Sequence, residues 1–317
     1  MSAEPRLSVV LPVHDAETHL RMALTSILEQ AFTDFEVIVV DDHSTDGSLE
    51  IVRELAAHDR RLRVVVLDEQ LGVGGALNVG LARVTAPLVG RMDADDIARP
   101  ERFAVQVAEM ERDTSLGLLG SQIEVIGHDG APEPMFPWAL PLTHDETVWQ
   151  LLFGTPICHP TVVMRTDVVR DLGGYDPGVV NEDMELWTRM AFVARMRNVD
   201  AVLLEYRMPA AVHAVKLAGW QPHITRVGQR YLERIVGVPV AEAVVLALRG
   251  IASERAPDDI DAALTNFAAA SLLVHAYDRM RSVGVLSGDG LESVSGLVES
   301  HVQELAARAH VLVAGRV

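Results

Sequence analysis

Short apolar runs alternate with amphipathic segments along the first part of the chain. Continuous apolar runs predict buried strands, which we expect over residues 7–11, 35–40, 64–67 and 88–89. Apolar residues spaced three or four positions apart predict helices, which we expect over residues 20–28, 51–55, 77–84 and 100–110. Strands without polar alternation, separated by helices, are typical of a mostly parallel sheet that is covered on both faces. The pattern therefore predicts an α/β fold.

The pattern changes twice further along the chain. Residues 116–206 are mixed and rich in Pro and Gly, and Asn181 has the position of an N-cap before a helix that carries Leu186 and Met190. From about residue 214 onward the spacing is helical throughout. We therefore expect a catalytic domain over residues 1–213 and a helical C-terminal region over residues 214–317.

Composition and charge restrict the partners. The chain has 317 residues and a net charge of −18, which argues against a nucleic-acid partner and leaves no basic patch for anionic lipid. No apolar stretch reaches the about 20 residues that a membrane-spanning helix needs, so we expect no transmembrane segment. The single cysteine, Cys158, excludes an intrachain disulfide and suits a reducing compartment. We expect a cytoplasmic protein and leave open a peripheral position at the inner membrane face.

A cluster of acids follows the fourth predicted strand. Asp93, Asp95 and Asp96 place three carboxylates within four residues, directly after an apolar run. Such carboxylates repel one another unless a cation or a hydrogen-bond donor is shared between them. Mg²⁺ and Mn²⁺ prefer oxygen ligands and usually bind one or two carboxylates together with substrate phosphates. The cluster predicts a metal–diphosphate site, whereas an isolated Asp-x-Asp would equally fit a solvated turn.

Other polar residues also come at the ends of predicted strands. Pro12 ends the first strand and Asp42 ends the second. Ligands of open α/β sheets bind at the carboxyl ends of the strands, so we expect Pro12, Asp42 and Asp93 to converge. The glycines of residues 72–75 lack the spacing of a dinucleotide or phosphate-binding loop. We expect them to permit a close backbone approach at a helix start.

A second pair of acids, Glu182 and Asp183, comes at the start of a predicted helix. Acids in a first helical turn offset the helix dipole by about 0.3–1 kcal/mol, which is a purely structural explanation. From position alone this explanation and a catalytic role both stand.

Taken in order, these motifs resemble the family 2 glycosyltransferases, which are inverting enzymes with the GT-A fold. The resemblance covers about residues 5–210 and rests on residues 8–14, 26–30, 39–47, 77–82, 92–96, 159–165, 173–176 and 181–187. One departure is Asp15, which stands where the family usually has Asn. The resemblance implies a GT-A domain, followed here by a helical region to which no part of the resemblance extends.

The resemblance also implies roles for individual residues. Asp42 would accept the uracil N–H of a nucleotide-diphospho-sugar, beside Pro12 and His14, and Asp93 would hold the ribose or the water shell of the metal. Asp95 would bind the Mn²⁺ or Mg²⁺ ion that bridges the diphosphate. Asp183 would be the general base, and Glu182 would orient it or bind the acceptor.

These roles agree with the chemistry of the reaction. A nucleoside diphosphate leaves readily only when its developing charge is neutralised, which a metal ion does directly. The acceptor hydroxyl must lose a proton as it attacks, so a carboxylate is needed on the opposite side of the sugar. The Gln-x-x-Arg-Trp motif of processive members is absent, which favours transfer of one sugar.

Several points stay open at this level. The acceptor is a glycan, a lipid-linked molecule or a small molecule, and the region after residue 214 forms an acceptor wall, a homodimer surface or a membrane-facing edge. Tyr206-Arg207 matches a family motif, but the His that usually follows is displaced to His213, so its contact with the metal is undecided. A sugar-1-phosphate nucleotidyltransferase and a non-catalytic nucleotide-sugar-binding protein are the alternatives.

Overall fold

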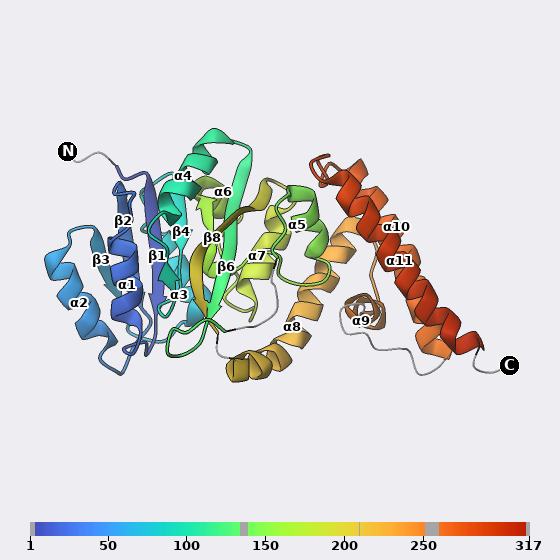
Figure 1. Cartoon of the computed structure of the whole chain (residues 1–317), viewed down its shortest axis with the longest axis horizontal. Coiled ribbons are helices and arrows are strands. Elements are labelled where there is room, and N and C mark those ends of the chain that lie inside the picture. The colour runs from blue at the N-terminus through green and yellow to red at the C-terminus, as the bar shows by residue number, and fades with distance from the viewer. Residues whose placement is uncertain (1–3, 134–138, 209, 251–259, 315–317) are drawn as a thin grey trace. The chain divides into compact units, whose positions relative to one another are not determined.

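The computed structural model describes residues 4–133, 139–208, 210–250 and 260–314, with the side chains of 210–218, 260–263 and 310–314 outside that description. The chain divides into two compact units. The first contains Met1–Leu142 and Ile157–Ala218, and the second contains Thr143–Pro156 and Gly219–Val317. Each unit is described by itself below (Figure 1).

An eight-stranded sheet forms the centre of the first unit. Its strands are β1 (Leu7–Val13), β2 (Phe35–Asp41), β3 (Leu62–Val66), β4 (Leu88–Arg91), β5 (Ile97–Ala98), β6 (Leu116–Ile126), β7 (Val163–Arg165) and β8 (Arg195–Arg207). They lie in the order β3-β2-β1-β4-β7-β6-β8-β5. The half from β3 to β4 is parallel, whereas β7 is antiparallel to both its neighbours and β5 is antiparallel to β8. The expected α/β fold with a mostly parallel sheet is confirmed.

Helices cover both faces of this sheet (Figure 1). They are α1 (Leu20–Leu28), α2 (Ser48–His58), α3 (Gly72–Leu81), α4 (Arg102–Arg112), α6 (Thr166–Asp171) and α7 (Glu182–Met190), with the 3-10 turn η1 (His159–Thr161). Alternate residues of β1 face opposite sides of the sheet, and each side is covered by its own layer of helices. Val9 packs in the core with α1, α2 and α4, whereas Val10 faces α3. A Cβ on Gly80 of α3 would lie 2.4 Å from Val10, so this glycine permits the close contact.

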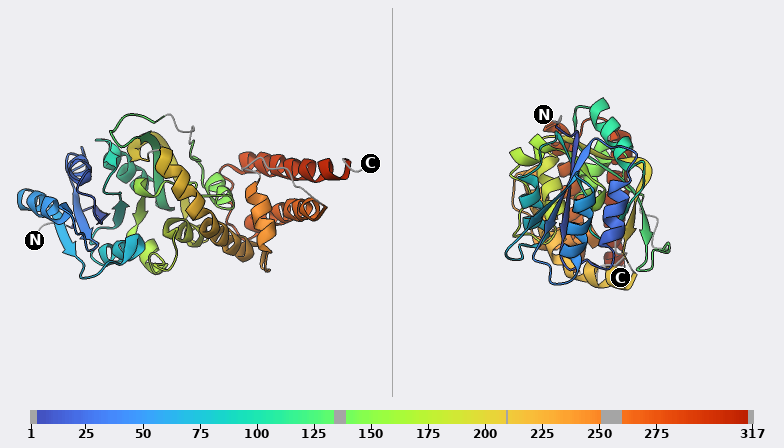
Figure 2. Two further views of the ribbon diagram at one scale, coloured as in Figure 1. Left: turned by 90° about the horizontal axis from the view of Figure 1, so that it is seen from below. Right: turned by 90° about the vertical axis from the view of Figure 1, so that its left-hand side faces the viewer.

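The second unit is helical, as expected for the C-terminal region. It contains α5 (His144–Gln150), most of α8 (Ala210–Val236), α9 (Glu242–Gly250), α10 (Ile260–Ser282) and α11 (Leu291–Ala314). The last two helices lie side by side (Figure 2). Asp145 of α5 accepts hydrogen bonds from the backbone N–H groups of Ser287 and Gly288, at 2.7 and 3.0 Å. These contacts explain why residues 143–156, which the sequence-based division left in the catalytic domain, belong to the helical unit.

Among the described residues, no helix has both the length and the apolar character that crossing a membrane requires.

Candidate active site

The acid cluster forms a group of oxygens directly after β4. Asp93, Asp95 and Asp96 each offer an oxygen, and these oxygens lie within 4.8 Å of one another. Asp96 is fully buried, and its Oδ1 accepts a hydrogen bond from the backbone N–H of Arg207 at 2.8 Å. Its Oδ2 is buried without a partner among the described residues. Burial, together with the charges of Asp93 and Asp95, raises the pKa of Asp96 well above its usual value. This donor set fits a hard divalent cation.

Three buried arginines fix the backbone and the acids of this loop. Arg91 Nη2 lies 2.6 Å from Asp93 Oδ1, and its side chain is 4% exposed. Arg102 of α4 donates to the carbonyl oxygen of Arg91 at 2.8 Å. Arg207 donates through Nε to the carbonyl oxygen of Asp95, also at 2.8 Å. The loop is therefore held from β4, α4 and β8, which are far apart in the sequence.

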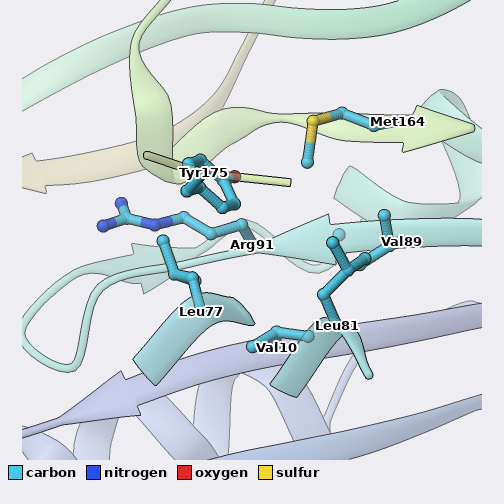
Figure 3. A pocket seen from close by; sticks show the side chains of 8 residues that line it. Val10, Leu77, Leu81, Val89, Arg91, Met164 and Tyr175 are labelled. Atoms are coloured by element: carbon cyan, nitrogen blue, oxygen red, sulfur yellow. The ribbon is translucent and has the colours of Figure 1, made fainter. Parts of the chain in front are cut away.

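The sequence analysis did not single out Arg91 or Arg102. The sequence did contain a signal for each of them. Arg91 follows an apolar strand, and Arg102 precedes Phe103 in an apolar helical stripe. A charge is rarely buried without partners, so both positions indicated buried, paired arginines. Figure 3 shows Arg91 extending from β4 between Tyr175 and Leu77, along a small pocket that is otherwise mostly apolar. Burial lowers the pKa of Arg91, but Asp93, Tyr175 and Glu182 raise it by more than that. The pKa therefore lies above its usual value, and the guanidinium stays charged.

The ends of β1 and β2 come together beside the acid cluster, as the topology requires. Pro12 of β1 pairs with Val40 of β2, and β4 is the other neighbour of β1. His14 is exposed, and its Nδ1 lies 2.8 Å from the carbonyl oxygen of Asp42. The expected convergence of Pro12, Asp42 and Asp93 at one edge of the sheet agrees with this strand order.

Asp42 is engaged by the start of α3. Its Oδ1 accepts from the backbone N–H of Leu71 at 2.7 Å, and its Oδ2 accepts from that of Gly72 at 2.8 Å. A carboxylate has about four acceptor sites, and these two bonds use half of them in a residue that is only 3% exposed. Gly72 has φ +74°, and a Cβ on Gly75 would lie 2.6 Å from the Cβ of Leu71, so these glycines permit the tight start of α3. A Cβ on Gly74 would meet the Glu182 side chain at 3.6 Å, which is an ordinary contact.

Asp15 has a clear structural role at the position where the family usually has Asn. Its backbone is left-handed, with φ 47°, a region that Asn and Asp tolerate better than most residues. Its Oδ1 accepts from the backbone N–H of Thr45 at 2.7 Å and so binds the loop that follows β2. Asp46 of that loop accepts from the N–H of Ser48, the first residue of α2, at 2.9 Å.

Glu182 and Asp183 open α7, and Asn181 occupies the N-cap position but makes no side-chain capping bond. Burial raises the pKa of Glu182 to about 7, and the charge of Asp183 adds to this effect. Burial also raises the pKa of Asp183. Acids whose role is to stabilise a helix start have lowered pKa values, because the dipole favours their charged form. The raised values therefore argue against a purely structural role for this pair.

The sequence also drew attention to His213 and Cys158. His213 lies in α8, but its side chain is outside the described residues, so the open question of its contact with a metal lies outside them too. Cys158 is only half-buried, and burial raises its pKa well above the usual value, which disfavours the thiolate that a nucleophile needs.

Residues 8–173 match the family described as "Glycosyl transferase family 2". The chain belongs to this family.

Other members and solved structures agree with that assignment. An amylovoran biosynthesis glycosyltransferase, AmsE of Erwinia amylovora, is 32% identical over 216 residues, which cover 67% of this chain and 80% of AmsE. An uncharacterized glycosyltransferase of Haemophilus influenzae is 30% identical over 212 residues, and the match spans only 66% of that relative's length. The fold resembles S. aureus TarS 1–349 solved in complex with UDP-GlcNAc, with a TM-score of 0.60 and 19% identity over 98% of this chain and 92% of TarS. It also resembles the mannosyltransferase PcManGT of Pyrobaculum calidifontis, solved with GDP-Man and Mn²⁺, with a TM-score of 0.60 and 19% identity over 99% of this chain and 86% of PcManGT. The family 2 chain thus has the GT-A fold.

Proposed function

We propose that this family 2 protein is a metal-dependent inverting glycosyltransferase that moves one sugar from a UDP-sugar to an acceptor hydroxyl, with a dTDP-sugar as the nearest alternative donor. The observation that carries the proposal is the arrangement of two sets of acids around one buried arginine. Arg91 pairs with Asp93 of the cluster after β4 and also interacts with Glu182, the neighbour of the proposed base. One set suits a metal–diphosphate, and the other suits a proton acceptor.

Asp95 would bind the Mn²⁺ or Mg²⁺ ion, and Asp93 would hold the ribose or the metal's water shell. When bound, the cation neutralises negative charge on the diphosphate leaving group. The unpartnered buried Oδ2 of Asp96 supports a cation in this loop, because an unshared buried carboxylate oxygen is costly. The Mn²⁺ complex of PcManGT supports a divalent ion as well.

The transfer itself needs one base and no covalent enzyme intermediate. The acceptor oxygen forms a bond to the anomeric carbon while the bond from that carbon to the diphosphate oxygen breaks. Asp183 takes the acceptor proton, and the nucleoside diphosphate leaves with the electron pair of the broken bond. One displacement of this kind inverts the anomeric centre. The raised pKa of Asp183 favours this role, since a base acts best when its pKa approaches the working pH.

The donor base would be read by Asp42, with Pro12 and His14 beside it. A carboxylate accepts the N3–H of uracil or thymine, whereas residues 12–17 and 41–50 contain no Lys or Arg that could donate to the O6 of guanine. TarS was solved with UDP-GlcNAc and PcManGT with GDP-Man, so the preference for UDP rests on Asp42 and on the lack of a cationic donor beside it. We propose that its bonds to the start of α3 fix this carboxylate in place.

The acceptor is a glycan, a lipid-linked molecule or a small molecule, and the helical unit would contribute to its binding, to a homodimer or to a membrane-facing edge. Names of relatives such as the amylovoran biosynthesis enzyme support a glycan-building role. The protein would act in the cytoplasm, where nucleotide-sugars serve as donors.

A panel of UDP-, dTDP- and GDP-sugars, incubated with and without Mn²⁺, tests the proposal. We expect slow metal-dependent release of UDP even when water is the only acceptor. Breakdown that requires pyrophosphate and yields UTP would instead indicate a nucleotidyltransferase. Binding without any turnover, unchanged by adding candidate acceptors, would indicate a nucleotide-sugar-binding protein.

A further inference from the structure

His159 connects Glu182 to a buried tyrosine. The imidazole Nδ1 of His159 lies 3.6 Å from Glu182 Oε1. Its Nε2 lies 3.0 Å from the hydroxyl oxygen of Tyr175. His159 is 8% exposed and Tyr175 is 4% exposed, so both are shielded from water. The three side chains form a chain of polar contacts that ends at the proposed catalytic pair.

The positions of both rings are fixed by their surroundings. Trp187 of α7 packs edge-on against His159, with ring centroids 5.7 Å apart and an interplanar angle of 84°. Asn78 of α3 binds the backbone of Tyr175 twice, accepting from its N–H at 2.9 Å and donating to its carbonyl oxygen at 2.8 Å. A Cβ on Gly174 would lie 2.5 Å from Asn78 Oδ1, so the glycine permits this contact. The rings are therefore pre-oriented.

The chemistry of the three groups determines where the protons are. An ionised Glu182 can only accept, so the ring nitrogen that faces it, Nδ1, must carry the hydrogen. The Nε2 of the neutral ring is then an acceptor, and the hydroxyl of Tyr175 donates to it. Burial and the charge of Arg91 lower the pKa of His159 well below its usual value, which keeps the ring neutral. Tyr175 thus selects one tautomer of His159.

We propose that Tyr175 and His159 are positioning residues that hold the carboxylate of Glu182 toward the acceptor, beside Asp183. The inference rests on the proposed function, because it gives Glu182 its place in that reaction. The distance of 3.6 Å exceeds a direct hydrogen bond, and catalytic hydrogen bonds often shorten only when substrate is bound. The charged groups that act on Glu182 are Asp183 of its own helix, Arg91 of β4 and Asp93 of the loop after β4.

Two substitutions of one residue separate this role from simple packing. His159→Asn leaves an amide N–H near the position of Nδ1, so it keeps the donor to Glu182 and loses the contact with Tyr175. His159→Gln places its amide near Nε2, so it keeps the contact with Tyr175 and loses the donor to Glu182. Loss of a hydrogen bond to a charged group costs about 1.5–3 kcal/mol, which corresponds to about a 10- to 150-fold fall in kcat.

We therefore expect His159→Gln to lower kcat by that factor with the KM for the donor unchanged, and His159→Asn to retain kcat within about 3-fold. The acid limb of the pH profile should move to higher pH in His159→Gln alone. Equal losses in both variants, with equal losses of thermal stability, would assign His159 to packing and overturn the inference.

A measurement that needs no turnover separates this inference from the proposed function. Two-bond ¹H–¹⁵N correlation spectra of the histidine rings report which nitrogen carries the proton, and His159→Gln identifies the signal. We expect His159 to be neutral with the hydrogen on Nδ1 at about pH 8.5, where Glu182, whose pKa is about 7, is ionised, and Tyr175→Phe to mix the two tautomers. A ring with the hydrogen on Nε2 in the unmodified protein would overturn the inference even if transferase activity is found. Failure of every donor in the activity panel would instead reject the proposed function.

Discussion

The guanidinium of Arg91 and the carboxylate of Asp93 form an ion pair of 2.6 Å at the end of β4, with the arginine almost fully buried. The pair connects the core of the sheet to the acid cluster, because Arg91 also lies in the field of Glu182 at the start of α7. One residue thus influences both halves of the proposed site. Its removal should disturb metal binding and stability together.

Arg91→Met removes this shared cation and keeps an unbranched apolar stem. Breaking a buried ion pair costs about 3–5 kcal/mol, and the 32% exposure of Asp93 reduces this to about 2 kcal/mol. We expect that loss in the free energy of unfolding, together with weaker Mn²⁺-dependent UDP binding. Urea denaturation and calorimetry measure the two effects. Arg91→Lys preserves the charge, so its stability and its Mn²⁺-dependent UDP binding should fall less. An Arg91→Met protein with unchanged stability would show that the ion pair does not stabilise the fold.

Asp95→Ala tests the metal ligand. We expect UDP to bind the variant equally with and without Mn²⁺, because the carboxylate that holds the cation is missing. Calorimetric titration of UDP under both conditions measures this, and Glu29→Ala, which removes an exposed acid at the end of α1, is the control. An unchanged enhancement by Mn²⁺ in Asp95→Ala would reject Asp95 as a ligand.

Asp183→Asn tests the base. The amide keeps the shape of the side chain but cannot accept the hydroxyl proton, so kcat should fall by about 10²–10⁴ while donor affinity survives. Asp167→Asn is a matched control, because Asp167 also lies in the first turn of a helix. Should Asp183→Asn lose thermal stability with normal turnover per folded molecule, Asp183 would be only a helix-start residue.

The pKa of Glu182 predicts how stability depends on pH. The folded protein holds this proton up to about pH 7, whereas an unfolded glutamic acid releases it near pH 4.5. The native state therefore binds more protons than the unfolded state between these values, and the free energy of unfolding falls as pH rises through this window. Glu182→Gln should remove up to about 3 kcal/mol of that fall. Melting temperatures at pH 5 and pH 8, measured without metal, test this; an identical pH dependence in both proteins would contradict it.

Competition of UDP, dTDP and GDP against one labelled donor tests nucleotide choice. Guanine O6 finds no Lys or Arg donor in residues 12–17 or 41–50, and an unpaired buried acceptor costs about 1–3 kcal/mol, so UDP should bind about 5- to 150-fold more tightly than GDP. We expect dTDP to compete nearly as well as UDP. Equal affinity for GDP would reject base recognition by Asp42 and leave the transferase proposal standing.

The sequence predicted the elements well where the pattern was local. The strands that begin at Leu7 and Phe35 and the helix over Leu20–Leu28 are confirmed, because burial on a sheet or along one helix face produces a period in the chain itself. The convergence of Pro12, Asp42 and Asp93 was also predictable, because each lies at or just after the carboxyl end of a predicted strand. These strands are β1, β2 and β4, which are neighbours in the sheet.

Contacts between distant segments were not predictable in the same way. The arginines that hold the acid loop come from β4, α4 and β8, and no period connects Arg102 or Arg207 to Asp96. The contact between His159 and Tyr175 likewise joins η1 to the segment before α7. The bonds of Asp42 to Leu71 and Gly72 also join the end of β2 to the start of α3, a contact that no local pattern in the sequence predicted.

The central claim is a metal-dependent single displacement at the anomeric carbon. The most direct measurement is the anomeric configuration of the first sugar that is released from a UDP-α-sugar by water, followed by ¹H NMR in the presence of Mn²⁺. Our account predicts that the β-anomer appears first, at a rate that EDTA abolishes. Initial release of the α-anomer, or an equal rate in EDTA, would contradict it.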